Sequence, residues 1–502
     1  MTAGRNGSES TTQRASLTGI AGLDDVLAGG VARGRLFLLE GSPGTGKTTV
    51  ATQFLMEGAR AGEKCLYITL SETEEELRET AASHGWDLGG ISIFELVPPE
   101  SLLDEQQQQS LLYSSDLELG EATRRIFSVF EKERPDRVVL DSLSEIRLLA
   151  QSSLRYRRQI LALKHYFSQW STTVLMLDDL TADAMDKTVH SIAHGVIRLE
   201  ELSPNYGSER RRLKVLKFRG RKFRGGFHDY VIDTGGVRVF PRLVSAEHRG
   251  HFPRTLLSSD SKELDALLGG GIARGSSTLI LGPAGTGKSL LTLIFLVAAI
   301  GRGERAALFV FDEELGLLFD RALGLGIDLQ GYVDAGSLMI EQVDAAELSP
   351  GEFSEHVRYC VERREISTIV IDSLNGYQAA MPEENALVLH MHELLQYLNR
   401  RGATTFLTVA QHGLVGDMRS PVDVTYLADT VVLLRYFEAF GRVRRAISII
   451  KKRTGGHEDT IREYRISSEG LKIGEPITGF QGVLRGIPTY TGDGPGLMKD
   501  SL

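Results

Sequence analysis

Two stretches of the chain have the spacing of glycine, lysine and hydroxyl residues that binds phosphate groups. They read GSPGTGKT at 41–48 and GPAGTGKS at 282–289, and both fit the pattern G-x-x-x-x-G-K-[ST]. The glycines let backbone N–H groups turn toward a phosphate, the lysine neutralises it, and the hydroxyl binds Mg²⁺. Each stretch follows an apolar run and opens a helical segment, which disfavours a glycine-rich turn that binds nothing. The predicted nucleotide-binding residues are Gly41, Ser42, Pro43, Gly44, Thr45, Gly46, Lys47, Thr48, Gly282, Pro283, Ala284, Gly285, Thr286, Gly287, Lys288 and Ser289.

Each half of the chain also has an aspartate at the end of an apolar run. Asp141 ends RVVLD, and Asp372 ends TIVID. An aspartate at the carboxyl end of a buried strand beside a phosphate loop holds Mg²⁺ through water. A lone aspartate there is more often a helix cap, but its recurrence at matched places favours the metal role. We therefore predict a metal site at Thr48 with Asp141 and another at Ser289 with Asp372, and the predicted cofactors are ATP and Mg²⁺.

Acidic residues at the end of a further apolar run have the place of a general base. Glu72 lies 25 residues after Lys47, and Glu313 lies 25 residues after Lys288 with Asp312 beside it. A carboxylate here orients and deprotonates the attacking water or hydroxyl, so we predict Glu72, Asp312 and Glu313 as catalytic residues. The alternative is helix capping, because both segments place acids in a first helical turn.

The two halves repeat each other beyond these motifs. The offset is 241 residues from Lys47 to Lys288 and 231 residues from Asp141 to Asp372. Offsets this similar indicate duplication of a whole domain, with small length changes in surface loops. The predicted domains are 16–245 and 259–490, joined by a linker at 246–258 and flanked by a disordered tail at 1–15 and a flexible tail at 491–502.

Within each half, short apolar runs alternate with helix-length segments. Near-continuous apolar strands separated by helices imply a mainly parallel sheet with helices on both faces, so the predicted class is α/β. Strand-like tracts after residue 210 predict an antiparallel hairpin extension. The strands predicted in the first half are 36–40, 65–70, 91–96, 138–141, 173–177 and 196–199.

Composition narrows the class of protein further. The formal net charge of -9 argues against a surface committed to nucleic acid. Cys65 and Cys360 lie in apolar runs, which favours reduced thiols in the core. The first fifteen residues lack the apolar region of a signal peptide, and the longest apolar stretch, 290–300, is about half the length that spans a bilayer. We therefore expect a cytoplasmic protein with no membrane insertion.

The sequence resembles the KaiC family of RecA-like P-loop ATPases over residues 16 to 490. Lys217-Phe-Arg219 and Lys451-Lys-Arg453 are similar to the K-x-R element that KaiC-like hexamers project into the neighbouring subunit's ATP. The resemblance implies two tandem RecA-like domains, a homo-oligomer that is a hexamer, and catalytic roles for Lys217, Arg219, Lys451 and Arg453. Such cations act as fingers that stabilise charge on the transferred phosphoryl group.

The residues around the first K-x-R element leave two alternatives. The stretch 210–224 contains nine lysines or arginines, which is also typical of a solvated basic hairpin. The same cations with Phe218, Phe223 and Phe227 have the composition of a single-stranded nucleic-acid site. The negative net charge and the expectation that alternating strand residues are core disfavour nucleic acid as a partner.

Two positions depart from the family pattern. Thr425 and Tyr426 stand where the family's second domain has a neighbouring Ser-Thr pair that receives phosphate. The resemblance therefore implies Thr425 as the phosphoacceptor of a Ser/Thr autokinase, while Tyr426 is expected to pack as a buried aromatic. His194 in the first half has the place of Asp429 in the second, and a lone histidine there is expected to be a satisfied structural residue.

These expectations combine into a KaiC-like signalling protein that binds and hydrolyses ATP. It acts as a homo-oligomer with signalling protein partners whose identity the sequence leaves open. The first alternative is a nucleotide-dependent scaffold with little turnover, which Ser71 favours because it removes an acid beside Glu72. The second alternative is a RecA-like ATPase directed by single-stranded DNA.

Overall fold

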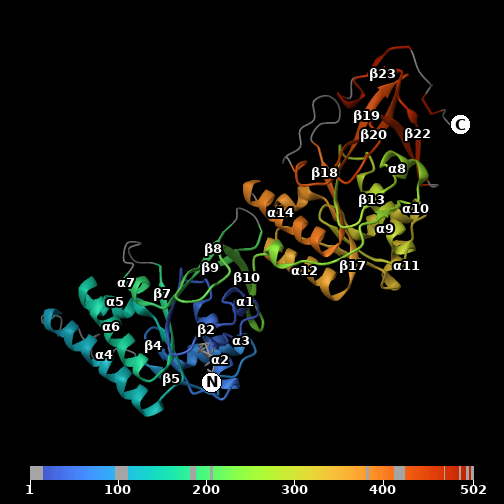
Figure 1. The fold of residues 1–502 in the computed structure, drawn as a ribbon. Helices are drawn as coiled ribbons and strands as arrows, with labels where there is room; N and C mark the ends of the chain where they lie inside the picture. Colours follow the sequence, from blue (N-terminus) through green and yellow to red (C-terminus); the bar gives the residue numbers. More distant parts are fainter. Residues whose placement is uncertain are drawn as a thin grey trace, which may run out of the picture. The chain divides into compact units, whose positions relative to one another are not determined.

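The protein divides into two compact units, residues Met1–Arg242 and Leu243–Leu502. The computed structural model, shown as a ribbon in Figure 1, describes residues 15–96, 111–180, 188–203, 207–379, 381, 384–411, 424–467, 470–485, 488–492 and 497–498. Most of the two predicted tails, 1–15 and 491–502, therefore lies outside the described residues.

The stretch predicted as a linker, 246–258, lies against the second unit. The backbone N–H of Gly250 donates to the carbonyl of Arg400 at 2.9 Å, and the ring of Phe252 lies under the backbone of Gly275 and Gly402. This segment thus belongs structurally to the unit that follows it.

The first unit is built on a nine-stranded sheet with the order β11-β10-β9-β8-β3-β7-β6-β4-β5. The six strands from β8 to β5 run parallel, and β9, β10 and β11 add an antiparallel extension. The predicted α/β class with an antiparallel hairpin extension is confirmed. The strands are β3 (Leu36–Gly41), β4 (Cys65–Thr69), β5 (Ile91–Glu95), β6 (Arg137–Asp141), β7 (Thr173–Asp179), β8 (Gly195–Leu202), β9 (Arg210–Phe218), β10 (Phe227–Asp233) and β11 (Gly236–Phe240).

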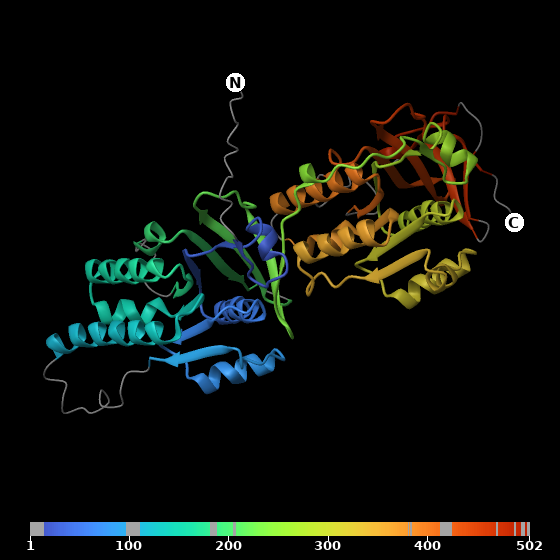
Figure 2. The ribbon, with the colours of Figure 1, turned by 60° about the horizontal axis from the view of Figure 1, so that its bottom comes forward.

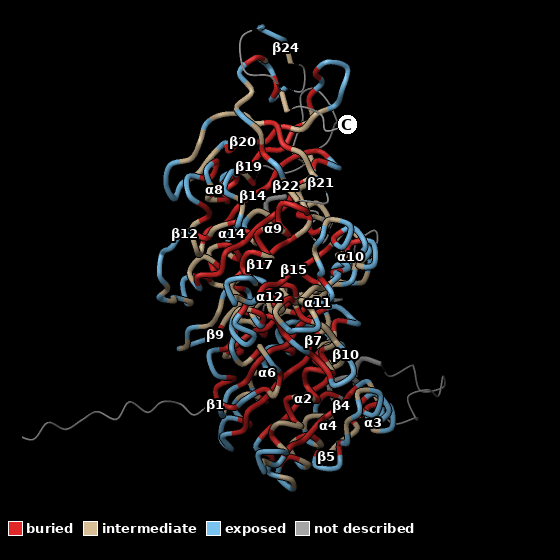
Figure 3. The backbone as a smooth tube through the Cα atoms, turned by 90° about the vertical axis from the view of Figure 1, so that its right-hand side faces the viewer, coloured by how far each residue is buried: buried red, intermediate tan, exposed pale blue. Residues whose placement is uncertain are grey.

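Helices cover both faces of this sheet because successive strand residues point to opposite sides. Phe37 and Leu39 of β3 pack in a core with Val50 and Phe54 of α2, whereas Leu38 packs in a second core with α4, α5 and α6. Figure 3 shows buried residues along these inner elements. The helices are α1 (Leu23–Val26), α2 (Lys47–Arg60), α3 (Glu74–Ser83), α4 (Leu111–Glu133), α5 (Leu143–Ala150), α6 (Ser153–Gln169) and α7 (Thr188–Ile192).

The second unit repeats this topology. Its sheet order, β16-β15-β17-β18-β14-β19-β20-β21-β22, matches the first strand for strand when read from the opposite edge. The strands are β14 (Ser277–Gly282), β15 (Arg305–Val310), β16 (Leu338–Gln342), β17 (Ile366–Asp372), β18 (Thr404–Ala410), β19 (Thr430–Ala439), β20 (Arg442–Lys452), β21 (Arg462–Ser467) and β22 (Gly470–Pro476).

The helices of the second unit occupy corresponding places. Figure 2 shows α12 and α14 side by side in orange. The helices are α8 (Lys262–Leu267), α9 (Lys288–Gly301), α10 (Leu315–Gly324), α11 (Leu329–Asp334), α12 (Pro350–Arg363), α13 (Leu374–Ala379) and α14 (Glu384–Arg401). Short two-stranded pairs complete the chain: β1 (Ala15–Ser16) with β2 (Val31–Ala32), β12 (Leu256–Leu257) with β13 (Ile272–Ala273), and β23 (Phe480–Gln481) with β24 (Thr489–Tyr490).

Most of the buried apolar residues in the described parts of the chain belong to the cores on the two faces of each sheet. The apolar stretch 290–300 lies in α9, most of whose residues are buried against the second sheet. None of the described helices is long and apolar enough to cross a membrane. Cys65 and Cys360 are buried free thiols, as predicted.

Candidate functional site

The first predicted phosphate loop joins the end of β3 to the start of α2. Gly46 has a φ of 84°, a left-handed conformation that disfavours any side chain. A Cβ at Gly46 would also lie 2.4 Å from Cδ1 of Ile232 on β10. The hydroxyl of Tyr230, on the same strand, donates to the carbonyl of Thr45 at 2.7 Å. The antiparallel extension thus supports the phosphate loop through Tyr230 and Ile232, a role that was not predicted from the sequence.

Lys47 lies at the start of α2 and is only 8% exposed. Its Nζ donates to the carbonyls of Gly41 and Ser42 at 2.9 Å each and forms an ion pair with Asp179 at 2.7 Å. Sequence reasoning missed Asp179, which ends β7. β7 pairs directly with β3, so that Asp179 lies opposite Gly41, and this strand order could not be read from the sequence.

Asp141 and Thr48 meet beside the loop, as predicted from their places. The hydroxyl of Thr48 lies 3.3 Å from Oδ2 of Asp141, which also accepts a hydrogen bond from the hydroxyl of Tyr67 at 2.6 Å. Burial raises the pKa of the Asp141 carboxyl above its usual range. Hydroxyl and carboxylate oxygens are ligands that Mg²⁺ prefers, so the pair fits a magnesium ion completed by phosphate and water. Among the described residues, no cluster of three His, Cys, Asp or Glu side chains offers an alternative metal site.

Glu72 lies in the loop after β4, next to Asp141. Burial raises the pKa of the Glu72 carboxyl, and the negative charge of Asp141 raises it further. Its Oε2 is buried without a hydrogen-bond partner. Helix α3 is capped instead by Thr73 and Glu76, which form a reciprocal capping box. Glu72 is therefore not the cap of α3, and its carboxylate lies beside the predicted metal position.

The second phosphate loop has the same frame but different contacts. Nζ of Lys288 donates to the carbonyl of Pro283 at 2.9 Å, and burial lowers the pKa of this lysine. Asp372 accepts from the hydroxyl of Thr408 at 2.5 Å. The place of Asp179 is taken by Ala410, which pairs with Gly282. The second lysine thus has no matching acid on the neighbouring strand.

The three acids after β15 have three different surroundings. Asp312 accepts a hydrogen bond from the hydroxyl of Ser373, the residue that follows Asp372. Glu313 turns away to an ion pair with Arg321 at 2.8 Å. Glu314 caps α10 by accepting from two backbone N–H groups, which lower the pKa of its carboxyl. Of the two predicted bases in this unit, Asp312 therefore lies nearer the metal position.

Both K-x-R elements fold against backbone carbonyls of their own unit. In the first unit, Nζ of Lys217 donates to the carbonyl of His190, and the guanidinium of Arg219 donates to that of Ser191 at 2.7 Å. In the second, Lys451 donates to the carbonyl of Thr425 at 2.9 Å, and Arg453 donates to that of Tyr426, also at 2.9 Å. The two elements are structurally equivalent.

Each K-x-R element lies at the opposite end of the sheet from its own phosphate loop. Phe37, near the start of β3, pairs with Gly195, which pairs with Phe218 between the two cations. The phosphate loop follows the other end of this six-residue strand, roughly 20 Å away. In the second unit, Thr278 near the start of β14 pairs with Thr430, which pairs with Lys452. Neither element is placed to contact a nucleotide bound by its own unit.

Thr425 and Tyr426 lie beside the second K-x-R element. The carbonyl of Thr425 accepts from Lys451, as described above, and the side chain of Thr425 is half-buried. Tyr426 is 51% exposed, so the expectation that it packs as a buried aromatic is wrong. The short turn at 425–427 presents the ring outward while its neighbours Val424 and Leu427 enter the core.

The basic stretch 210–224 is partly neutralised by neighbouring acids. Arg211 pairs with Glu201 at 3.2 Å, and Arg212 pairs with Glu200 at 2.9 Å, both across the β8–β9 pair. Phe218 is buried in the core, and Phe223 packs against it. Phe227 is 36% exposed and lies under Arg212 and Lys214. Two of the three aromatics are thus used for packing.

Comparison with known protein families gives a match over both units. Residues 16–244 and 258–477 each match the family described as "ATPase: KaiC". The chain belongs to the KaiC ATPase family. The resemblance inferred from the motifs is thus confirmed, and the duplication corresponds to two family domains in tandem.

Relatives in the KaiC family match the chain over nearly its full length. The circadian clock protein KaiC3 of Synechocystis is 27% identical over 94% of this chain and 94% of its own length. The circadian clock oscillator protein KaiC of Acaryochloris marina is 29% identical over 94% and 91%. KaiC of Synechococcus elongatus is 28% identical over 97% and 94%. The chain is therefore similar to these KaiC proteins in domain content as well as in motifs.

Proposed function

We propose that the protein is an ATPase of the KaiC type in which each bound ATP is completed by the K-x-R element of a neighbouring copy. The position of these elements carries the proposal. Lys217 and Arg219 lie far from their own phosphate loop, yet they recur at the equivalent place in the second unit as Lys451 and Arg453. A cation pair at the end of the sheet opposite its own phosphate loop can take part in catalysis only at the nucleotide of another protomer. Because the pair recurs in both units, this arrangement favours a closed ring such as a hexamer.

The chemistry is attack of water on the γ-phosphorus of ATP, giving ADP and phosphate. In the first unit, Lys47 exchanges its contacts with backbone carbonyls and Asp179 for the β- and γ-phosphates. Magnesium, held near Thr48 and Asp141, neutralises phosphate charge when it is bound. Glu72 orients the water and accepts its proton. In the second unit, Lys288, Ser289, Asp372 and Asp312 take the same roles, with Glu313 beside them.

The finger residues act on the charge that develops during bond cleavage. Lys217 and Arg219 of one copy would leave the carbonyls of His190 and Ser191 and bind the γ-phosphate oxygens on the next copy. Because this contact exists only in the assembly, ATP turnover and assembly become linked. Through this link, ATP turnover would change the surfaces that the assembly presents to partner proteins.

We also propose that Thr425 accepts phosphate from the ATP of a neighbouring copy. The support is its position, since its backbone carbonyl is bonded by the finger residue Lys451. A nucleotide that reaches Lys451 therefore comes close to the Thr425 hydroxyl. In this step the oxygen–γ-phosphorus bond forms, ADP leaves, and the hydroxyl proton passes to the Asp312 carboxylate of the copy that holds the ATP.

The finger proposal is tested by phosphate release from the full chain carrying Lys288→Ala, which confines turnover to the first unit. Arg219→Ala in this background should reduce the rate about 10²-fold or more, because a phosphoryl-transfer finger contributes about 10³ to 10⁵. Arg221→Ala, two residues further along the same basic stretch, is the matched control and should retain the rate. Equal rates for Arg219→Ala and the control would show that the basic stretch is only a solvated hairpin.

A further inference from the structure

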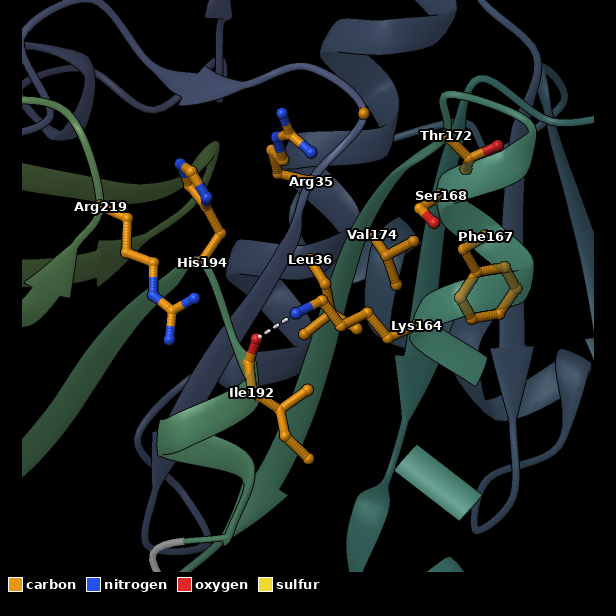
Figure 4. Close-up of a pocket in the computed structure, with 11 residues that line it drawn as sticks. Arg35, Leu36, Lys164, Phe167, Ser168, Thr172, Val174, Ile192, His194 and Arg219 are labelled. Carbon is orange, nitrogen blue, oxygen red and sulfur yellow. Dashed lines mark hydrogen bonds between the residues drawn. The ribbon is translucent and has the colours of Figure 1, made fainter. Parts of the chain in front are cut away.

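A cavity at the edge of the first unit collects cations without an acid. It has a volume of about 140 Å³ and lies between the start of β3, the end of α6 and the segment joining α7 to β8. Arg35, Lys164, His194 and Arg219 line it, and none of the described lining residues is acidic. Figure 4 shows these side chains around the cavity, and they come from the segment before β3, from α6, from the α7–β8 segment and from the end of β9.

The polar groups in this cavity are incompletely satisfied. Nε2 of His194 is buried without a hydrogen-bond partner, so the expectation of a satisfied structural histidine is wrong. Lys164 donates to the carbonyl of Ile192 at 3.0 Å, and Arg219 donates to that of Ser191. No ion pair of Arg35 occurs among the described residues. Burial lowers the pKa of Lys164 and of His194, and the neighbouring cations Arg35 and Arg219 lower both further.

The second unit has an aspartate, Asp429, at the position equivalent to His194. The backbone N–H of His194 donates to the carbonyl of Leu36, and in the second unit the N–H of Asp429 donates in the same way to Ser277, the residue that matches Leu36. The N–H groups of Arg219 and Arg453 likewise donate to the carbonyls of His194 and Asp429. His194 and Asp429 are therefore equivalent by backbone bonding.

Asp429 puts a carboxylate into the second unit's version of the cavity. Its Oδ2 accepts from the N–H of Ser277 at 3.0 Å and from the side-chain amide of Asn399 at 3.2 Å, and its Oδ1 lies 3.9 Å from Arg453. The corresponding cavity is larger, at about 900 Å³, and its lining includes Asp429 together with five arginines, among them Arg453.

The first unit replaces this carboxylate with cations. Lys164 stands where the second unit has Leu395. The N–H of Thr172 donates to the carbonyl of Phe167, and the N–H of Ala403 donates in the same way to that of Leu398. Lys164 and Leu395 each lie three residues before the accepting residue. Arg35 stands where the second unit has Ser276. The N–H of Val174 donates to the carbonyl of Arg35, and the N–H of the equivalent Thr405 donates to the carbonyl of Ser276. Three of the four groups, the cations Arg35 and Lys164 and the imidazole of His194, are thus specific to the first unit. Among the described residues, no acid lines the cavity to balance their charge.

We propose that this cavity is a binding site for one oxyanion, held by Arg35, Lys164 and His194, and by Arg219 while that side chain is not bound to the ATP of a neighbouring copy. A volume of about 140 Å³ admits an ion of phosphate size, since a water molecule takes about 30 Å³ of liquid. Charge-assisted hydrogen bonds from guanidinium and ammonium groups are the strong form of such contacts. The unpartnered His194 Nε2 supplies one more. The oxyanion is either a free ion such as phosphate or the carboxylate of a second copy of the chain.

Equilibrium dialysis with radioactive inorganic phosphate tests the free-ion source. The full chain should carry Lys47→Ala and Lys288→Ala, so that neither phosphate loop contributes and ATP turnover has no influence on the result. We expect one bound phosphate per chain. His194→Asp, which installs the residue of the second unit, and Arg35→Ala should each weaken binding by about tenfold or more. Arg254→Ala, an exposed arginine in the lining of the second unit's cavity, is the matched control and should leave binding unchanged.

Light scattering over a range of protein concentrations tests the second source. If a carboxylate of another copy fills the cavity, His194→Asp should weaken self-association and added phosphate should compete with it. Sulfate, whose charge does not change near neutral pH, should bind or compete better as the pH falls, because His194 becomes cationic beside Arg35, Lys164, Lys217 and Arg219. The proposal is wrong if His194→Asp and Arg35→Ala change neither phosphate binding nor self-association. ATP binding at the first phosphate loop, restored with Lys47 intact, verifies that the first unit of each variant folds.

Discussion

Carboxylates around the two metal positions have unequal surroundings, and this inequality sets the chemistry each can perform. Glu72 is held beside Asp141 with one buried, unpartnered oxygen, which is the state expected of a base waiting for its water. In the second unit the equivalent residue, Glu313, forms an ion pair with Arg321. Asp312 instead lies near the end of β17, where it accepts a hydrogen bond from Ser373. Single residues thus decide which acid faces the reaction in each unit.

Phosphate release from variants of these acids tests the assignment. Glu72→Gln, measured with Lys288→Ala, should reduce turnover in the first unit by about 10² to 10⁴-fold. Asp312→Asn, measured with Lys47→Ala, should reduce turnover in the second unit more than Glu313→Gln does, and Glu314→Gln is the matched control. A larger loss for Glu313→Gln than for Asp312→Asn would contradict the geometry.

The raised pKa of Glu72 gives the pH dependence of turnover in the first unit a definite sign. Glu72 must be ionised to accept a proton, and burial with Asp141 raises the pKa of its carboxyl. Turnover should therefore fall as the pH drops through this raised pKa, at a higher pH than for an ordinary glutamate.

At the scale of elements, the antiparallel extension does two jobs at the two ends of each sheet. Tyr230 and Ile232 of β10 support the first phosphate loop, and Tyr464 and Ile466 of β21 make the same contacts with the second. The K-x-R element at the end of β9 or β20 faces the opposite end. One extension thus supports its own nucleotide loop and carries the cations that we propose act on a neighbouring copy.

Thr425 tests this arrangement at the level of the turn before β19. Incubation with Mg²⁺ and ATP followed by phosphopeptide mapping should find phosphate on Thr425 and none on a Thr425→Ala variant. Lys451→Ala should reduce the signal, because the proposed role of Lys451 is to bind the γ-phosphate beside this turn. Phosphate found only at another residue would reject Thr425 as acceptor.

The sequence was sufficient for features that are local and repeated. The six parallel strands of the first sheet and both glycine-rich loops follow from short patterns, and the pairing of Thr48 with Asp141 follows because neighbouring parallel strands end together. Asp179 and Tyr230 were missed because their partners are far away in the chain and depend on strand order. Tyr230 had a usable signal, since its offset of 234 residues to Tyr464 equals that of the K-x-R element.

At the scale of the whole molecule, the two units have similar candidate nucleotide sites that differ at individual residues. The first loop lysine has an acid partner, Asp179, where the second has Ala410. The first edge cavity has His194 where the second has Asp429. These differences favour separate tasks for the two units, with ATP turnover in both and phosphate acceptance by Thr425 in the second.

Subunit complementation is the most direct test of pockets completed across protomers. One variant lacks both loop lysines (Lys47→Ala, Lys288→Ala) and keeps its fingers, and the other lacks both finger arginines (Arg219→Ala, Arg453→Ala) and keeps its loops. Each should release little phosphate alone. When the two are unfolded or dissociated and assembled together, intact fingers meet intact loops, so activity should return to a substantial fraction of the unmodified rate. A mixture that stays as inactive as its components, although light scattering shows that mixed assemblies form, would contradict the account.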